Sequence, residues 1–314
     1  MLKPIRHLFP PLVTGIVVLM IGISLLKVGF MYAGGGGWLL NNKPELFGNS
    51  NHLIISFTVL IVAVWANQKG KGMVSSASIL IGMIAGYIVA MMMGMVNYGK
   101  IAGADWFAFP MPLQYGIEFI PGAIILMLFM AVVTTIETIG DISATTMGGD
   151  NREATDKELS GGIMADGLGT AFGSLFNAMP NTSYSQNAGL VAFTGVISRH
   201  VGTVAGVILI FMGLFPKLGG IIAAMPESVI GGAAIIMFGL ITSAGIKLVA
   251  QSEMSQRNLL ILGLSLSFGL GLSMLPQFVS HIPDFGISFK LLLTTGLIPA
   301  GLLAFVLNAT LSKK

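Results

Sequence analysis

Acidic side chains within long apolar stretches are the first candidates for chemistry in this 314-residue sequence. Glu137 and Asp141 lie one helical turn apart in the apolar segment 121–146, on the same face as Thr138. Two carboxylates this close cannot both ionise cheaply in an apolar setting, which suits a carrier of protons. The alternative for Asp141 is a wet position near the end of a membrane span. The same face also carries Thr134 and Thr145.

A second polar stripe follows in the segment 160–178. Asp166, Thr170, Gly173 and Asn177 recur at helical spacing on one face. Two polar stripes in neighbouring apolar helices are expected to face each other across a cavity, because lipid would leave the polar groups unpaired. The alternative for Asp166 is a hydrogen bond that only holds two helices together.

The stretch from Asn177 to Gly189 interrupts the helical pattern with Pro180 and a run of amides and hydroxyls. Such a backbone is tolerated at membrane depth only inside the protein. We therefore expect a short extended stretch near 179–187, followed by a half-helix that begins near Ser185. Its free N–H groups, with Gln186, Asn187 and Glu137, would suit the edges of a flat heterocycle. The alternative is that these amides only satisfy the broken backbone.

The elements that position these groups must be membrane helices. Apolar residues make up 54% of the chain and charged residues 9%, and the mean hydropathy is +0.87. A soluble domain carries roughly 25% charged residues, so this composition excludes a cytosolic enzyme, a nucleic-acid binder and a disordered chain. The absence of cysteine excludes disulfides, a thiolate nucleophile and Cys-ligated metal. The predicted fold class is therefore an all-α polytopic membrane protein.

About ten transmembrane segments are predicted, and both termini are placed in the cytoplasm of the cell. With this topology the inner side carries eleven of the sixteen Lys and Arg residues, as the positive-inside rule requires. The inner loop includes Thr155 and Glu158 at the spacing of a capping box. The first segment resembles a signal peptide, but its length and Pro10-Pro11 favour a true span. The segments lie near 12–31, 53–66, 73–95, 121–146, 160–178, 184–198, 201–215, 228–249, 257–272 and 288–308; those at 53–66, 184–198 and 201–215 are short, as broken helices often are.

An internal repeat supports a transporter architecture. When the chain is shifted by about 217 residues, Gly15 meets Gly232, Met20 meets Met237 and Gly22 meets Gly239. The two copies run in opposite directions in the predicted topology. Paired segments of opposite direction are typical of inverted-repeat transporters.

The residues around the interrupted stretch resemble a known family. Gln186-Asn-x-Gly189, followed by Thr194 and Arg199, is similar to the signature of the nucleobase–ascorbate transporter family, also called nucleobase:cation symporter family 2. The Gln-Asn pair resembles its xanthine and uric acid permease branch, because uracil permeases usually have Glu at the position of Gln186. The resemblance covers essentially the whole chain, including Glu137-Thr-Ile-Gly-Asp141, Ala165-Asp166-Gly-Leu-Gly, Leu8-Phe-Pro-Pro-Leu-Val-Thr-Gly15, Phe215-Pro-Lys-Leu-Gly-Gly220 and the span with Gly231-Gly232.

The resemblance implies a fourteen-span fold of two inverted seven-span repeats, with a core domain, and a gate domain that often forms homodimers. Residues 1–120 resemble gate spans five to seven, and residues 225–314 resemble gate spans twelve to fourteen. Residues 121–224 resemble core spans eight to eleven. The chain begins at what resembles span five, so the family's first four spans, two of which close the binding site, have no counterpart in it.

The resemblance also implies site residues and a function. Glu137 and Gln186 would bind a purine base, with Asn187 and the Ser185 backbone lining the site. Asp166 would serve coupling, and Asp141 is a further candidate for it. Gly189, Thr194 and Arg199 would be signature positions. The implied function is a non-enzymatic permease for xanthine or uric acid, driven by protons or alternatively sodium, which moves by an elevator mechanism and needs no cofactor, metal or nucleic acid.

Several alternatives stay open. A uracil or other nucleobase permease of the same family is one, and a non-transporting remnant is another. A sulfate or bicarbonate carrier of the same fold gives no reason for Gln186-Asn187. An intramembrane aspartyl protease would use Asp141 and Asp166, but Thr138 stands where that motif has Gly.

Overall fold

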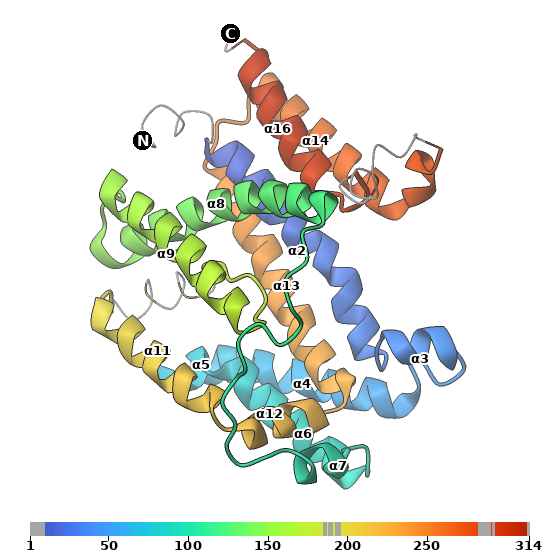
Figure 1. The fold of residues 1–314 in the computed structure, drawn as a ribbon. Coiled ribbons are helices and arrows are strands. Elements are labelled where there is room, and N and C mark those ends of the chain that lie inside the picture. Colours follow the sequence, from blue (N-terminus) through green and yellow to red (C-terminus); the bar gives the residue numbers. More distant parts are fainter. Residues whose placement is uncertain are drawn as a thin grey trace. The chain divides into compact units, whose positions relative to one another are not determined.

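The computed structural model describes residues 10–184, 187, 191, 196–281, 290 and 293–312. All regular structure in these ranges is helical, and they contain no strand (Figure 1). This confirms an all-helical protein. The helices are α2 (Pro11–Ala33), α3 (Gly37–Asn42), α4 (Ser50–Lys69), α5 (Met73–Ser76), α6 (Ser78–Met92), α7 (Tyr98–Ala102), α8 (Pro121–Asp150), α9 (Asp156–Leu175), α11 (Arg199–Gly213), α12 (Pro216–Ala224), α13 (Glu227–Ala250), α14 (Gln256–Met274), the 3₁₀ turn η1 (Pro276–Val279) and α16 (Leu297–Thr310).

The lengths and apolar character of these helices fit a polytopic membrane protein. In the described part of the chain, α2, α4, α8, α13 and α14 are each long and apolar enough to cross a membrane. A sixth span exists if α11 and α12, which are bent by 82° at their junction, are counted together. Helices α6 and α16 are apolar but shorter. The prediction of about ten spans in a 7+7 repeat stays a prediction.

Most of the predicted apolar segments coincide with described helices. The segment 73–95 is divided between α5 and α6, and the segment 288–308 coincides with α16 only from residue 297. The segment 184–198 falls mostly outside the described residues. The segment 53–66 is not short, because α4 has 20 residues. Asn49 caps its first turn by accepting a hydrogen bond from the His52 backbone N–H at 3.0 Å, and the helix continues through polar residues to Lys69. The apolar pattern therefore underestimated this helix, since its polar ends are helical too.

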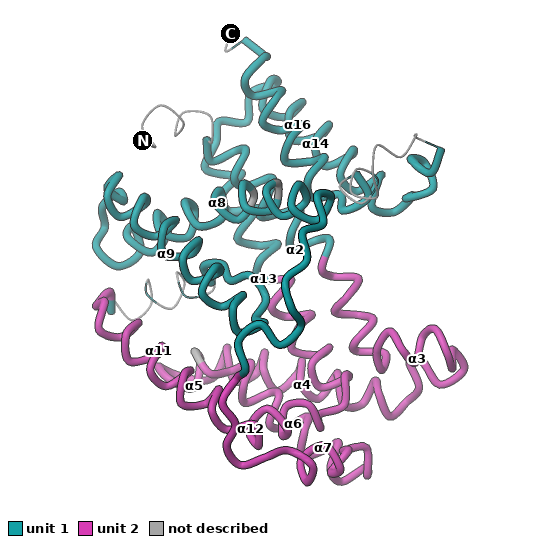
Figure 2. The backbone as a smooth tube through the Cα atoms, in the orientation of Figure 1, with its two compact units in different colours: residues 1–24, 111–196, 240–314 teal, residues 25–110, 197–239 magenta. Residues whose placement is uncertain are grey.

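The chain divides into two compact units, drawn in different colours in Figure 2. Unit 1 comprises residues 1–24, 111–196 and 240–314, and unit 2 comprises residues 25–110 and 197–239. Two of the four boundaries lie within α2 and α13, and the other two, at 110/111 and 196/197, lie outside the described helices. The assignment of 1–120 and 225–314 as gate spans and of 121–224 as core spans stays a prediction.

Each unit has its own apolar core, and small residues bring its backbones close together. In unit 1, a methyl group built on Gly15 would lie 2.7 Å from the Val249 backbone nitrogen. In unit 2, a methyl group on Gly82 of α6 would lie 2.6 Å from the Val59 carbonyl oxygen of α4. Close backbone approach is the usual way that helices gain contact in lipid. The buried core residues are Leu12, Val13, Ile16, Val249, Ile261 and Ala304 in unit 1, and Ile55, Val59, Ala90, Val96, Ala224, Val229 and Ala233 in unit 2.

Candidate functional site

The turn between α8 and α9 fixes how the two polar stripes meet. Helix α8 ends at Asn151 in the left-handed conformation (φ 51°), which Asn tolerates well. Thr155 and Glu158 form the predicted capping box: the Glu158 N–H donates to Thr155 Oγ1 at 3.3 Å, and the Thr155 N–H donates to Glu158 Oε2 at 2.8 Å. The capping box is therefore confirmed.

Arg152 strengthens this turn with a bidentate pair to Glu158. Its Nη1 and Nη2 donate to the two Glu158 carboxylate oxygens at 2.9 and 2.6 Å. The guanidinium and the Thr155 groups hold the pKa of Glu158 far below its usual range, and the same carboxylate raises the pKa of Arg152. The clamp lies in water-exposed positions, so it orients the turn more than it stabilises the protein.

Thr138 of α8 and Asp166 of α9 join the two stripes directly. Thr138 Oγ1 donates to Asp166 Oδ2 at 2.5 Å, and the Thr138 side chain is only 2% exposed. One turn away, Gly162 of α9 lies against the tip of Ile142, so the helices are close together here. The stripes do face each other, as predicted. At this level they meet through a hydrogen bond, where the sequence predicted a cavity between them.

The predicted extended stretch follows α9. Residues 178–184 are not helical, and Asn177 before them has a left-handed backbone (φ 62°). Thr170 of α9 fastens this stretch, because its hydroxyl donates to Asn181 Oδ1 at 2.7 Å and accepts from the Asn181 N–H at 3.2 Å. The Asn177 amide donates to the Met111 carbonyl at 3.0 Å. The interruption is confirmed as far as Tyr184; the half-helix predicted from Ser185 lies mostly outside the described residues.

Ser183 connects the extended stretch to α8. Its hydroxyl lies 2.6 Å from Asp141 Oδ2 and 3.4 Å from Thr138 Oγ1. The sequence reasoning placed Asp141 and Thr138 on the polar face but missed Ser183. The signal was present, since Ser183 follows Pro180 in a run of hydroxyl and amide side chains, but nothing local showed which carboxylate it would meet.

The remaining predicted residues are placed as follows. Glu137 is half-buried on α8, one turn before Asp141. Asn187 is exposed, and its backbone N–H donates to the Tyr184 carbonyl at 3.0 Å. Arg199 is the exposed first residue of α11, in unit 2. The predicted residues Ser185, Gln186, Gly189 and Thr194 lie outside the described residues, so their roles stay predictions.

This arrangement brings together side chains that can accept and donate protons. Two carboxylates, Asp141 and Asp166, are linked through hydroxyl groups, and Glu137 lies on the same helix face. Carboxylates and amides also offer the acceptors and donors that match the edges of a base. Within the described ranges, no group of three or more His, Asp or Glu side chains is placed to hold a metal ion.

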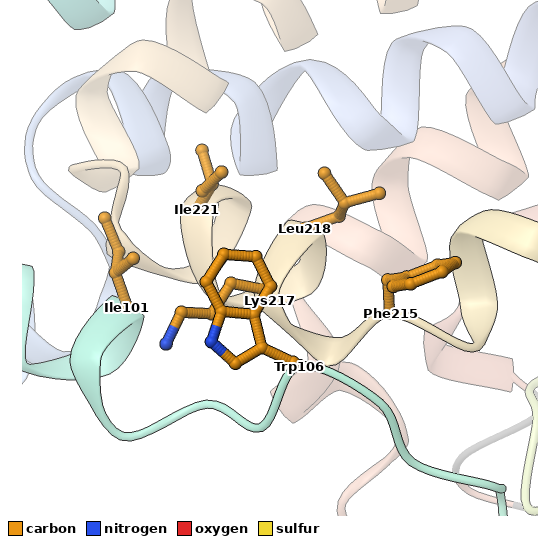
Figure 3. Close-up of a pocket in the computed structure, with 6 residues that line it drawn as sticks. All are labelled: Ile101, Trp106, Phe215, Lys217, Leu218 and Ile221. Atoms are coloured by element: carbon orange, nitrogen blue, oxygen red, sulfur yellow. The ribbon is translucent and has the colours of Figure 1, made fainter.

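A separate pocket of about 410 Å³ lies in unit 2, beside the bend between α11 and α12 (Figure 3). Lys217 is engaged there: its Nζ donates to the Ala104 carbonyl at 2.9 Å and lies 5.3 Å from the centre of the Trp106 ring. None of the six lining residues has a carboxylate or amide side chain that would read a base edge. The lining residues are Ile101, Trp106, Phe215, Lys217, Leu218 and Ile221.

Comparison with known proteins identifies the family. A model of the Permease family, which covers xanthine and uric acid permeases, matches residues 1–278. A Clostridium perfringens protein named as a purine permease is 37% identical over 312 residues, which are 99% of this chain and 67% of that protein. The Escherichia coli xanthine permease XanP is 36% identical, over 96% of this chain and 65% of XanP. The Escherichia coli uric acid transporter UacT is 36% identical, over 96% of this chain and 61% of UacT.

The chain thus spans about two thirds of the length of these relatives. The similarity runs through the α8–α9 hairpin and the interrupted stretch, which are the regions that hold the carboxylates and the predicted signature. A permease also accounts for the apolar helices and for the polar groups between them. The chain belongs to this permease family, in the xanthine and uric acid branch of the nucleobase–ascorbate transporters.

Proposed function

We propose that this protein carries purine bases, xanthine or uric acid, across the cell membrane together with protons. The observation that carries the proposal is the similarity of this chain, over nearly its whole length, to proteins named as purine permease, xanthine permease and uric acid transporter. The sequence identity to these proteins is 35–37%. The hydrogen-bonded carboxylates of α8 and α9 support it, because they are groups that a proton-driven carrier needs inside the membrane.

In this proposal the base binds at the interrupted stretch. Glu137 accepts a hydrogen bond from a ring N–H of the base, and Gln186 and Asn187 pair with its carbonyl and N–H edges. The Ser185 backbone lines the same site. Asp141 and Asp166 carry the coupling proton. An elevator-like motion of core against gate, in a homodimer joined through the gate, then moves the base across.

The test is uptake of labelled xanthine by cells that lack their own purine permeases, with uric acid and uracil as competitors. The 314-residue chain is compared with a version extended to the nearest upstream start of its reading frame. We expect uptake that uric acid competes with, that a protonophore blocks and that sodium removal leaves unchanged. Competition by uracil but not by uric acid would indicate that the substrates are pyrimidines. Loss of uptake on removal of sodium would indicate that sodium, and not the proton, is the coupling ion.

Absence of uptake by both versions, at normal membrane expression, would contradict the proposal and favour a non-transporting remnant. Uptake of sulfate or bicarbonate in place of bases would favour an anion carrier. A Glu137→Gln variant tests the proposed base-binding carboxylate. Its matched control is Glu118→Gln, which removes an exposed carboxylate from the loop before α8 and leaves the polar face intact.

A further inference from the structure

Four oxygen atoms form a continuous chain between the two carboxylates of the α8–α9 region. Asp166 Oδ2 lies 2.5 Å from Thr138 Oγ1, which lies 3.4 Å from Ser183 Oγ, which in turn lies 2.6 Å from Asp141 Oδ2. The four residues come from three segments: α9, α8 and the extended stretch after α9. Thr138 at the centre is 2% exposed, so water does not replace its partners freely.

Counting protons shows what this chain requires. It contains three oxygen–oxygen links, but Thr138 and Ser183 supply only two hydroxyl protons. When both carboxylates are ionised, the two hydroxyl protons fill the two short links to Asp166 and Asp141, and the 3.4 Å link between Ser183 and Thr138 has no proton. When both are protonated, four protons compete for three links. All three links are filled once each only when one carboxyl proton is present.

We infer that Thr138 and Ser183 form a hydroxyl relay through which a proton passes between Asp141 and Asp166. The inference rests on the proposed proton-coupled transport and names two positioning residues for it. Neither hydroxyl needs to touch the base. Their role is to carry a proton from one carboxylate to the other.

The transfer balances without any other reactant. With Asp141 protonated, its O–H donates to Ser183, the Ser183 O–H donates to Thr138, and the Thr138 O–H donates to ionised Asp166. A shift of each of these three protons along its link gives ionised Asp141 and protonated Asp166. No covalent bond between heavy atoms changes, and the total number of protons stays constant.

The 3.4 Å link between Ser183 and Thr138 controls this transfer. Hydroxyl hydrogen bonds are usually about 2.7–2.8 Å long, so the relay conducts only when this link shortens. Ser183 belongs to the extended stretch that directly precedes the predicted base-binding residues Ser185 and Gln186. A shift of this stretch on base binding would therefore change the Ser183–Thr138 distance and couple the base to the proton.

Among the described residues, the other titratable groups near the relay are few, and one of them is Tyr184, which directly follows Ser183. Glu137 lies on the same face of α8, one turn before Asp141. Helix α9 carries, besides Asp166, only Asp156, Lys157 and Glu158 in its first turn. Helix α16 and the part of α2 near Gly140 have no titratable side chain. Glu137 is thus the group whose charge most directly influences the transferred proton.

The experiment uses the full chain in lipid vesicles with two readouts. The first is the infrared carbonyl band of a protonated carboxyl, recorded at neutral pH. The second is xanthine transport, measured both as exchange at equal pH and as accumulation driven by a pH gradient. The variants are Thr138→Val, Ser183→Ala and Thr138→Ser. Thr146→Val is the matched control, because Thr146 is a buried α8 hydroxyl that donates only to backbone carbonyls of its own helix.

We expect Thr138→Val and Ser183→Ala both to shift or remove the infrared band and to reduce driven accumulation roughly tenfold or more, the effect of one lost charge-assisted hydrogen bond, while exchange persists. Thr138→Ser and Thr146→Val should behave like the parent. A parent-like band and parent-like accumulation in Thr138→Val would overturn the relay. If the parent chain exchanges no xanthine, the proposed function fails, and the infrared comparison still decides whether the relay exists.

Discussion

The helix pairs α4–α6 in unit 2 and α8–α9 in unit 1 have the same antiparallel arrangement and different contacts. Gly82 and Gly86 of α6 lie directly against Val59 and its neighbours in α4, so that backbone meets backbone. Helices α8 and α9 meet through a side-chain hydrogen bond between Thr138 and Asp166. One pair is joined by apolar packing, and the other combines the packing of Gly162 against Ile142 with a polar link.

The two kinds of helix contact contribute differently to stability and to function. In lipid, helices are not driven together by the hydrophobic effect, so close packing between small residues supplies attraction. Polar contacts between membrane helices are worth only about 0.6 kcal/mol on average. The polar contacts between α8 and α9 therefore add little stability, and their main effect is to hold the carboxylates of the site in place. Changes in the polar pair should affect transport, and changes in the packed pair should affect folding.

The largest expected effect is that of Glu137→Gln in the polar pair. We expect xanthine binding to weaken at least tenfold to a hundredfold, because the amide cannot replace a charged acceptor, while the melting temperature stays near that of the parent. Binding is measured by calorimetry on purified protein. Parent-like affinity would remove Glu137 from the binding site, and Glu118→Gln controls for the loss of a carboxylate.

The next effect is that of Gly82→Ala in the packed pair. The added methyl would meet the Val59 carbonyl oxygen at 2.6 Å and the Ala63 Cβ at 2.8 Å, so the helices must separate. We expect a loss of about 1–3 kcal/mol in the free energy of unfolding, measured in detergent micelles. Gly263→Ala in α14 is the control, since nothing lies within 4 Å of its added methyl. Equal stability of the two variants would show that α4 and α6 are not tightly packed.

A smaller effect is expected for Gly162→Ala in α9. The added methyl would overlap the tip of the Ile142 side chain, which can change rotamer, and would lie in ordinary contact with Thr138 Cγ2 at 3.9 Å. The cost should be about 0.5–1.5 kcal/mol before any gain in helix propensity, and less than for Gly82→Ala. Thermal unfolding of both variants under the same conditions checks the order. A larger loss of stability for Gly162→Ala than for Gly82→Ala would contradict the conclusion that α4 and α6 are the more tightly packed pair.

The smallest effect concerns the exposed clamp of Arg152 and Glu158. Because the pKa of folded Glu158 is depressed, its contribution to stability is complete above the unfolded value of about 4.5 and is lost as the pH falls through the folded value. Glu158→Gln should therefore lower stability slightly at neutral pH. The difference from the parent should shrink in acid. Unfolding measured from neutral to strongly acidic pH tests this, and a difference that grows in acid would contradict the assigned partners.

Local sequence patterns predicted the features that depend on neighbouring residues. The capping box needs only Thr155 and Glu158 three residues apart, and both of its hydrogen bonds are present. The interruption after α9 follows from Pro180 and its polar neighbours, and residues 178–184 are indeed not helical. The length of α4 was underestimated, because apolar periodicity does not extend to the polar turns at either end.

The partners of the buried carboxylates could not be predicted in this way. Periodicity placed Thr138 and Asp141 on one face of α8, but it does not say which oxygen of another segment they meet. The contacts with Asp166 and Ser183 depend on the rotation and register of α9 and on the path of the extended stretch. The engagement of Lys217 with Trp106 and Ala104 is a similar case, since the residues are far apart in the chain.

The sequence by itself determined that this is a membrane protein of the purine permease family, because composition, helical periodicity and a short signature are properties of residues and their spacing. Only the tertiary structure decided that Thr138 and Ser183 join Asp141 to Asp166. Hydrogen bonds require donor and acceptor to lie close together, and that distance is set by how separate segments pack. Spacing along the chain identifies the chemical groups, and packing determines which of them are hydrogen-bonded to one another.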